Sequence, residues 1–316
     1  MSTMGFQSCA IVFGITAALL ATTAGCGDDE GSTSSSSSSS STEGTGGAGG
    51  AGGAGGAGGS ASAHVKIEFE GRVGDAIFDC NATYPNLGMS GSEVKITDFR
   101  LYVYDVRLHA AGGGEKISVK LDQDGLWQHE SVALLDFEDK SGSCANGTSE
   151  KNGSIMGEVP AGEYDGISFK LGVPFELNHG DASIAPSPLN LTALFWNWNG
   201  GYKFLRVDSV PTGGSGPFNL HLGSTGCLPE MGDVTSCDRP NVAEIVLTGF
   251  DPTKNKIVAD YAALVAESDL SSDGGGAPGC MSGPMDPECG AIFERLGITI
   301  QDGSIHPEMQ VFFRVE

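Results

Sequence analysis

Apolar and polar residues alternate along several short stretches of this chain. Alternation with a period of two is typical of β-strands that bury one face. The stretches are 64–70, 94–96, 99–108, 116–121, 166–173, 218–222, 243–248 and 310–315. Helix is scarce, with short candidates at 260–266 and 292–296. Many short strands separated by turn residues predict an all-β fold, a single β-sandwich-like domain.

The segment 195–208 predicts a β-hairpin, because β-rich residues flank the turn signal Asn199-Gly200-Gly201. Trp196 and Trp198 lie two residues apart, so their side chains should project from the same face of the strand. Such a pair has two interpretations, as aromatic residues that pack a sandwich core or as a site in which one indole is modified to make a ligand.

The first 25 residues have the pattern of a lipoprotein signal peptide. An apolar run at 11–20 precedes Ala24-Gly25-Cys26, which resembles a lipobox, although residues 1–10 contain no Lys or Arg. The run is shorter than the roughly 20 residues of a membrane-spanning helix. We expect cleavage before Cys26 and lipidation of its thiol. The product would be an exported, membrane-anchored lipoprotein, periplasmic or on the outer-membrane surface, that contacts the membrane only through its lipid.

Residues 26–60 are rich in Ser, Gly and Ala and predict a disordered linker between the lipid and a folded domain at 61–316. All 17 Lys and Arg and 36 of the 40 Asp and Glu fall in that domain, a formal charge of −19. This acidity argues against nucleic acid as a partner, since nucleic-acid binding needs a basic surface.

Six cysteines lie in the folded domain, and an even number in an exported domain predicts disulfides. Cys227 and Cys237, and likewise Cys280 and Cys289, are close in sequence and suit local pairing, which leaves Cys80 with Cys144. Fifteen connectivities are possible for six cysteines, so this pairing is a hypothesis. The Cys-x2-4-Cys spacing of structural zinc sites is absent.

Sequence signatures of common enzymes are also absent. The chain has no Gly-x-Ser-x-Gly elbow, no His-Glu-x-x-His helix and no phosphate-binding Gly-x4-Gly-Lys loop. The segment 122–125 has the start of a calcium loop but lacks its later Glu, so we interpret it as a turn. Among six histidines, His179 follows a strand and His221 lies at a strand end.

A resemblance rests on several separate segments in order, which are 78–80, 127–128, 134–139, 172–175, 177–179, 186–191, 195–198, 201–204, 221–227 and 279–284. Together these segments resemble the MbnP-like copper-binding proteins, a four-Cys, Trp-x-Trp family found beside di-haem MauG-type (cytochrome c peroxidase-like) enzymes. The resemblance implies that the haem enzyme oxidises the first Trp of the motif, Trp196, to kynurenine. Kynurenine offers an amine and a ketone where indole offers only an N–H donor.

The resemblance therefore implies an extracytoplasmic copper protein in copper homeostasis, a substrate of the haem enzyme and not itself an enzyme. We expect His179 and His221 to join the modified Trp196 as ligands of copper, most suitably Cu(I), with His64 as the next candidate near the same sheet edge. Met156 and Met281 could add sulfur, although Met more often packs. Trp198 is assigned to packing or to relaying the oxidising equivalent.

Two other functions remain open from the residues alone. Trp196 and Trp198 could form a stacking platform in a carbohydrate- or surface-binding module. The domain could also be a disulfide-stapled structural unit without a ligand.

Overall fold

The computed structural model describes residues 61–197 and 199–316. The expected signal peptide, Cys26, the linker to residue 60 and the side chain of Trp198 lie outside the described residues. Strands dominate the described part, as the alternation predicts. None of its helices has the length and apolar character that a membrane span requires.

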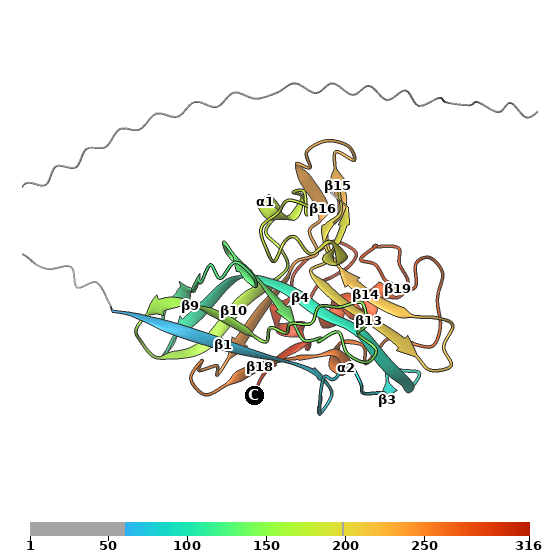
Figure 1. Ribbon diagram of the computed structural model, residues 1–316, viewed down its shortest axis with the longest axis horizontal. Helices are drawn as coiled ribbons and strands as arrows, with labels where there is room; N and C mark the ends of the chain where they lie inside the picture. The colour runs from blue at the N-terminus through green and yellow to red at the C-terminus, as the bar shows by residue number, and fades with distance from the viewer. Residues whose placement is uncertain (1–60, 198) are drawn as a thin grey trace, which may run out of the picture. The chain divides into compact units, whose positions relative to one another are not determined.

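Two larger sheets form the body of the domain in the described residues (Figure 1). The six-stranded sheet has the order β20 (Phe313–Val315), β18 (Lys256–Asp260), β1 (Ser62–Val73), β9 (Ser154–Pro160) and β6 (Lys120–Leu121), with β2 (Ala76–Ile77) paired to β1. The ten-stranded sheet has the order β17 (Ala243–Thr248), β10 (Tyr164–Leu171), β4 (Ser92–Ala110), β13 (Leu205–Pro211), β14 (Phe218–Leu222) and β19 (Gly279–Cys280). Along β4 lie β3 (Tyr84–Leu87), β5 (Lys116–Ser118) and β8 (Val132–Asp136), and β7 (Gln128–His129) pairs with β8.

The inner faces of the two sheets pack through aromatic rings. Phe69 of β1 meets Phe169 of β10 edge to face with ring centroids 5.6 Å apart, and Phe169 meets Phe313 of β20 at 5.1 Å. Phe99 of β4 packs against Phe137 at 5.1 Å. Edge-to-face pairs at these separations stabilise a core beyond the area they bury. The contacts confirm the all-β, sandwich-like fold.

The alternation places most strands correctly and fails in three places. Segments 94–96 and 99–108 belong to one long strand, β4. Segment 116–121 is two strands in different sheets, because β5 pairs with β4 and β6 pairs with β9. Only Phe313–Val315 of segment 310–315 is strand, and Pro307–Met309 forms a 3-10 turn just before that segment.

The helices of the described residues are short. Both helix candidates are confirmed, as α2 (Tyr261–Leu264) and α3 (Cys289–Arg295). Asp260 begins α2 by accepting hydrogen bonds from the backbone N–H groups of Ala262 and Ala263. A third helix, α1 (Phe175–Asn178), begins directly after Pro174, a few residues beyond the end of β10 at Leu171. The turn at 122–125 is also as expected, since Asp124 accepts three backbone N–H groups from residues 126–128.

The three expected disulfides are all present. Cys80 joins Cys144, Cys227 joins Cys237, and Cys280 joins Cys289. The first closes a separation of 64 residues, and the other two close 10 and 9. Disulfides are typical of proteins outside the reducing cytosol, so they indicate an extracytoplasmic location.

The loop lengths make a prediction about stability. Chain entropy lost by the unfolded state grows with loop length, so Cys80–Cys144 should contribute about 4 kcal/mol and Cys227–Cys237 about 3 kcal/mol. We expect the Cys80→Ser/Cys144→Ser double variant to lose more free energy of unfolding than the Cys227→Ser/Cys237→Ser variant. Urea unfolding of wild type and the two variants measures their free energies of unfolding. A larger loss in the Cys227→Ser/Cys237→Ser variant would contradict the prediction.

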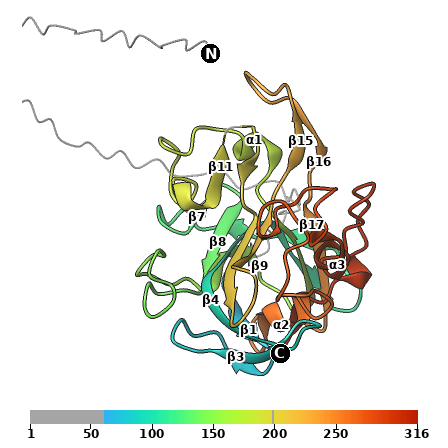
Figure 2. The same cartoon turned by 90° about the vertical axis from the view of Figure 1, so that its right-hand side faces the viewer.

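Two small hairpins extend from one end of the ten-stranded sheet. One consists of β11 (Phe195–Asn197) and β12 (Gly201–Tyr202), after the 3-10 turn η1 (Thr192–Leu194). The other consists of β15 (Thr225–Leu228) and β16 (Ser236–Arg239), and it projects beside α1 (Figures 1 and 2). The β11–β12 hairpin follows β10 and α1 along the chain, and the β15–β16 hairpin follows β14. The ends of β10 and β14 therefore position the candidate site.

Candidate metal site

The tryptophan motif lies on the expected hairpin. Phe195 pairs with Tyr202 across it, and their rings meet edge to face at 4.9 Å. The backbone N–H of Gly200 donates to the Asn197 side chain at 2.7 Å and tightens the turn. Because neighbouring side chains on a strand point to opposite faces, Trp196 points away from the Phe195–Tyr202 pair.

Trp196 is partly buried against the loop that follows β14. A Cβ atom added at Gly223 would lie 2.6 Å from Cζ3 and 3.1 Å from Cη2 of the indole, closer than real contacts allow. Glycine at position 223 therefore lets the indole reach the loop backbone. The ring centroids of Trp196 and His221 are 6.4 Å apart, with the planes tilted by 55°.

His221 is buried on β14 and has two different ring nitrogens. Its Nε2 lies 2.6 Å from Oδ1 of Asp208 on the adjacent strand β13. Its Nδ1 is buried and has no hydrogen-bond partner among the described residues. A buried polar atom without a partner costs free energy, so such an atom in a folded protein calls for an explanation.

The charge state of Asp208 fixes which nitrogen carries the proton. Burial by itself would raise the pKa of Asp208, but hydrogen bonds and charge from His221 and Arg206 outweigh it and lower the pKa to about 2. An ionised carboxylate only accepts hydrogen bonds, so Nε2 of His221 must donate. Burial lowers the pKa of His221, against the opposing effect of Asp208, which favours the neutral ring. The lone pair of neutral His221 is therefore on Nδ1.

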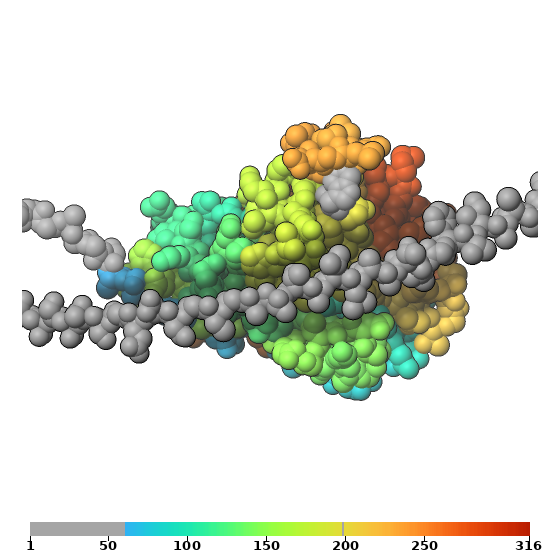
Figure 3. Space-filling model, turned by 45° about the horizontal axis from the view of Figure 1, so that its top comes forward, coloured from blue at the N-terminus to red at the C-terminus, as the bar shows by residue number. Residues whose placement is uncertain are grey.

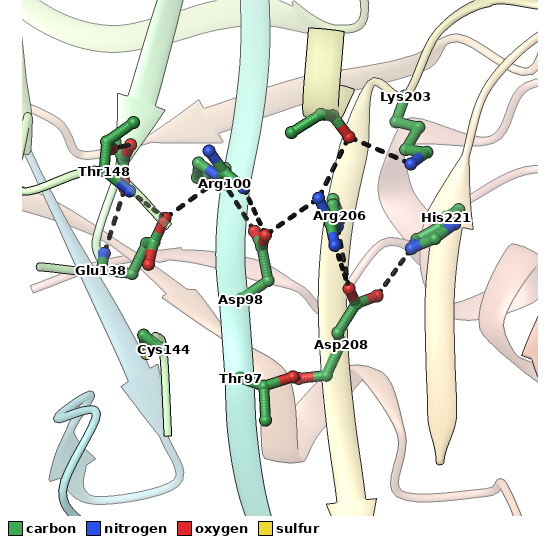
Figure 4. A network of polar contacts seen from close by, with 12 residues as sticks. Thr97, Asp98, Arg100, Glu138, Cys144, Thr148, Lys203, Arg206, Asp208 and His221 are labelled. Atoms are coloured by element: carbon green, nitrogen blue, oxygen red, sulfur yellow. Dashed lines mark hydrogen bonds and ion pairs between the residues drawn. The ribbon is translucent and has the colours of Figure 1, made fainter. Parts of the chain in front are cut away.

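A buried chain of ion pairs holds Asp208 in place (Figure 4). Arg206 donates to Oδ2 of Asp208 from Nε at 2.8 Å, and its Nη1 lies 3.2 Å from Asp98. Asp98 in turn binds Arg100, which is 1% exposed. Arg206 and Lys203 also both donate to the Ala193 carbonyl at 3.0 Å, so the same cluster fixes the turn that leads into Trp196.

The end of β14 that carries His221, together with the loop that follows it, is fixed from the other side. Ser282 donates to the His221 carbonyl at 2.8 Å and accepts the N–H of Gly223 at 2.9 Å. Asn241 donates to the Gly223 carbonyl at 2.8 Å. With its strand paired to β13 and its loop held by two side chains, His221 is held in place before any ligand arrives.

His179 lies at the end of α1, on the β15–β16 side of the hairpin. Its Nε2 is 3.5 Å from Sγ of Cys237 and 3.2 Å from Nδ2 of Asn178, and its ring packs on Phe175. Asn178 accepts the N–H of Tyr202 and donates to Ser224 at 3.3 Å. The two expected histidines thus flank the hairpin, His221 beside Trp196 and His179 beside the disulfide.

The remaining candidates lie elsewhere, apart from Met281. His64 lies on β1 in the other sheet, half exposed and 2.7 Å from Asp122, so our expectation that it shares a sheet edge with His221 is wrong. Met156 lies on β9 of that same other sheet. Met281 immediately precedes Ser282 in the loop that holds His221, and its N–H donates to Asp286. Trp198 lies outside the described residues.

The far end of the ion-pair chain contains an unusual carboxyl group. Burial raises the pKa of Asp136 to about 7, against lowering by the Thr148 hydrogen bond and Arg100. Because the folded pKa exceeds the unfolded value of 3.8, the folded state binds this proton more tightly. This contribution to stability is complete below about pH 3.8 and is lost as the pH rises through about 7.

This shift predicts a specific effect of one substitution. In Asp136→Asn the group no longer titrates, so the decline in stability between about pH 4 and 7 should shrink, by up to about 4 kcal/mol. Urea unfolding at several pH values measures it. Asp139→Asn is the control, because the Ser141 hydrogen bond lowers the pKa of Asp139 and any effect should appear only in acid. Equal slopes for wild type and Asp136→Asn would contradict the prediction.

The arrangement can bind a metal ion through an imidazole nitrogen. Nδ1 of His221 has a lone pair, the Asp208 carboxylate holds the opposite nitrogen, and the Trp196 ring lies 6.4 Å from the imidazole ring. Carboxylate–histidine pairs of this kind orient ligands in metal sites. The sequence did not reveal Asp208 as the partner of His221; the only signal is that both lie on strands, and cross-strand register decides the contact.

Comparisons with known proteins identify the family of the chain. The MbnP family model matches residues 62–282, which include Trp196, His179 and His221. The solved structure of MbnP from Methylosinus trichosporium superimposes with a TM-score of 0.71 at 29% sequence identity, covering 81% of this chain and 98% of that one. The comparison with curated proteins gives no match. From the extent of the family match and the shared fold, the chain belongs to the MbnP family.

Proposed function

We propose that this chain is an exported copper-binding protein whose site forms when a di-haem MauG-like enzyme oxidises Trp196 to kynurenine. The MbnP family is associated with the copper-binding methanobactin system and linked with a partner enzyme in it. In this proposal the chain is a substrate of that enzyme, not itself an enzyme, and serves copper homeostasis as a lipid-anchored protein.

Nδ1 of His221, which has no hydrogen-bond partner among the described residues, carries the proposal. It is a buried lone pair, held by Asp208 through the opposite nitrogen, and its ring lies 6.4 Å from that of Trp196. A metal ion would satisfy this nitrogen, and neutral imidazole suits copper. His221 is therefore the first ligand in the proposal.

Oxidised Trp196 would supply an amine ligand in addition to the histidine nitrogens. Indole nitrogen is a donor only, so the unmodified side chain offers a metal no lone pair. Oxidative opening of the five-membered ring gives an aromatic amine and a ketone, and the amine can bind a metal. Trp196 lies against Gly223 and 6.4 Å from the His221 ring, so its modified side chain would remain close to His221. His179 is the second histidine ligand and Met281 a source of sulfur for Cu(I).

The contacts of Trp196 speak against the stacking-platform alternative. A sugar-binding platform needs an open aromatic face. Here Gly200 and Gly223 lie against the indole and His221 lies beside it.

The test compares protein made with and without the haem enzyme. We expect the peptide covering residues 194–203 to have one carbon replaced by one oxygen only when the enzyme is present, and copper to bind stoichiometrically only to that sample. Peptide mass spectrometry and copper analysis on the same preparations measure both. Stoichiometric copper on protein with wholly unmodified Trp196 would refute the mechanism.

A further inference from the structure

One disulfide faces a histidine across a small gap. Cys227 and Cys237 are directly opposite each other on β15 and β16, which pair only with each other in the described part of the chain. Nε2 of His179 lies 3.5 Å from Sγ of Cys237. The potential ligand atoms of all three residues lie within 4.8 Å of one another. Figure 3 shows the orange β15–β16 hairpin projecting at the edge of the domain.

The other two disulfides differ from this one in access and surroundings. Cys80–Cys144 has Glu138 as a neighbour, but its cysteines are only 3% and 0% exposed. Cys280–Cys289 is equally buried and has no third metal-ligating group nearby in the described residues. Cys237, by contrast, is partly exposed and lines a cavity of about 280 Å³.

The cavity gives a reductant a route to the sulfur. Its walls include Phe175, Val242 and Ser236, and it opens beside α1. Exposed disulfides are the labile ones, because thiol–disulfide exchange requires a thiolate to reach a sulfur atom. Attack at Cys237 would release the Cys227 thiolate next to His179.

We propose that Cys227, Cys237 and His179 form a redox-gated metal site for a thiophilic d10 cation, Zn²⁺ or Cu⁺. Two equivalents of a small thiol, or one dithiol, reduce the disulfide by two electrons and are themselves oxidised to a disulfide. The two cysteine thiols then lose their protons on binding the cation, and neutral His179 supplies the third ligand. Two thiolates and an imidazole are a donor set typical of zinc and cuprous ions.

The local geometry suits this exchange. After reduction, the two sulfurs must lie about 3.7 Å apart to accept two metal–sulfur bonds in tetrahedral geometry. Rotation of the two cysteine side chains can supply this separation, because the strands are held independently of the disulfide. Asn199 donates to the carbonyls of Cys227 and Pro229 at 3.0 and 3.1 Å and keeps β15 in place.

The site is independent of Trp196 and shares only His179 with the proposed copper site. It therefore does not require the haem enzyme, and it would exist in protein whose Trp196 is intact. Its failure and the failure of the copper proposal are separate results, because the two depend on different chemical changes.

The experiment uses the full chain made without the haem enzyme. The protein is treated with dithiothreitol without oxygen, exposed to Zn²⁺, and desalted; alkylation and mass spectrometry identify which cysteines are reduced. We expect Cys227 and Cys237 to be reduced first and one zinc to be retained per chain. We also expect zinc to protect these two thiols from alkylation.

Three variants sharpen the result. Cys227→Ser/Cys237→Ser should retain no zinc, and His179→Ala should bind it at least about tenfold more weakly. Cys280→Ser/Cys289→Ser, with a loop of nearly the same length, should bind as wild type does. Reduced wild type that retains no zinc, zinc that leaves both thiols reactive, or equal binding by the oxidised protein would overturn the proposal.

Discussion

Trp196→Phe, produced together with the haem enzyme, should fold normally and yet acquire no copper site. Phenylalanine still presents a six-membered ring to Gly223, so the packing survives in large part. It has no nitrogen to become an amine, so the ligand cannot form. We expect copper to fall from one ion per chain to a trace, measured by metal analysis after desalting, while the thermal unfolding temperature changes little.

The matched control is Trp127→Phe. Trp127 is partly buried against the core and precedes β7, outside the β11–β12 hairpin, so its replacement should leave both the modification and copper binding intact. Trp198→Phe should mainly slow the modification. Full copper occupancy in Trp196→Phe would remove kynurenine from the ligand set.

His221→Ala should weaken copper binding by more than about 100-fold, beyond the 10- to 100-fold typical of residues that only orient a ligand. The ligand lone pair is lost, while Asp208 keeps its ion pair with Arg206, so the fold should survive. Competition with a chelator on modified protein measures the affinity. His64→Ala is the control, since His64 is in the other sheet beside Asp122, and it should bind copper as wild type does.

Asp208→Asn separates positioning from ligation at the same site. An amide N–H directed at Nε2 would move the imidazole proton to Nδ1 and block the lone pair. We expect a smaller loss than in His221→Ala, about 10- to 100-fold. The two neutral tautomers bind the same number of protons, so a loss of affinity that does not change with pH above the pKa of the ring would agree with a change of tautomer. Unchanged affinity in both variants would exclude Nδ1 as a ligand.

The period of two reveals a strand only where one face is buried and the other is wet. Strand β1 alternates in burial and was predicted, whereas β8, Val132–Asp136, is buried at every position and has no alternation to detect. Alternation also does not show which strand pairs with which, so the division of 116–121 between two sheets was missed. Alternation continues through Val119 while the pairing partner changes from β4 to β9.

The candidate site was likewise predictable only where its signal is local in the sequence. Local sequence predicted the Trp196 hairpin and pointed to His221 at a strand end. Arg206 and Asp208 look like an ordinary exposed pair two residues apart, as do Lys66 and Glu68, which bind each other on the surface. Only the register between β13 and β14 places Asp208 behind His221, and only the fold brings His179 to Cys237, 58 residues away. Such long-range contacts leave no local signal.

The absence of a side chain at position 223 has a consequence for how this sequence can change over time. The atoms of Trp196 that Gly223 accommodates, Cζ3 and Cη2, belong to the benzene ring, which ring opening to kynurenine would leave intact. In the proposed mechanism the loop has to fit the residue that the ribosome inserts and also the one that the oxidation would produce. Position 223 would then be constrained by two successive side chains, and even alanine would crowd the first of them.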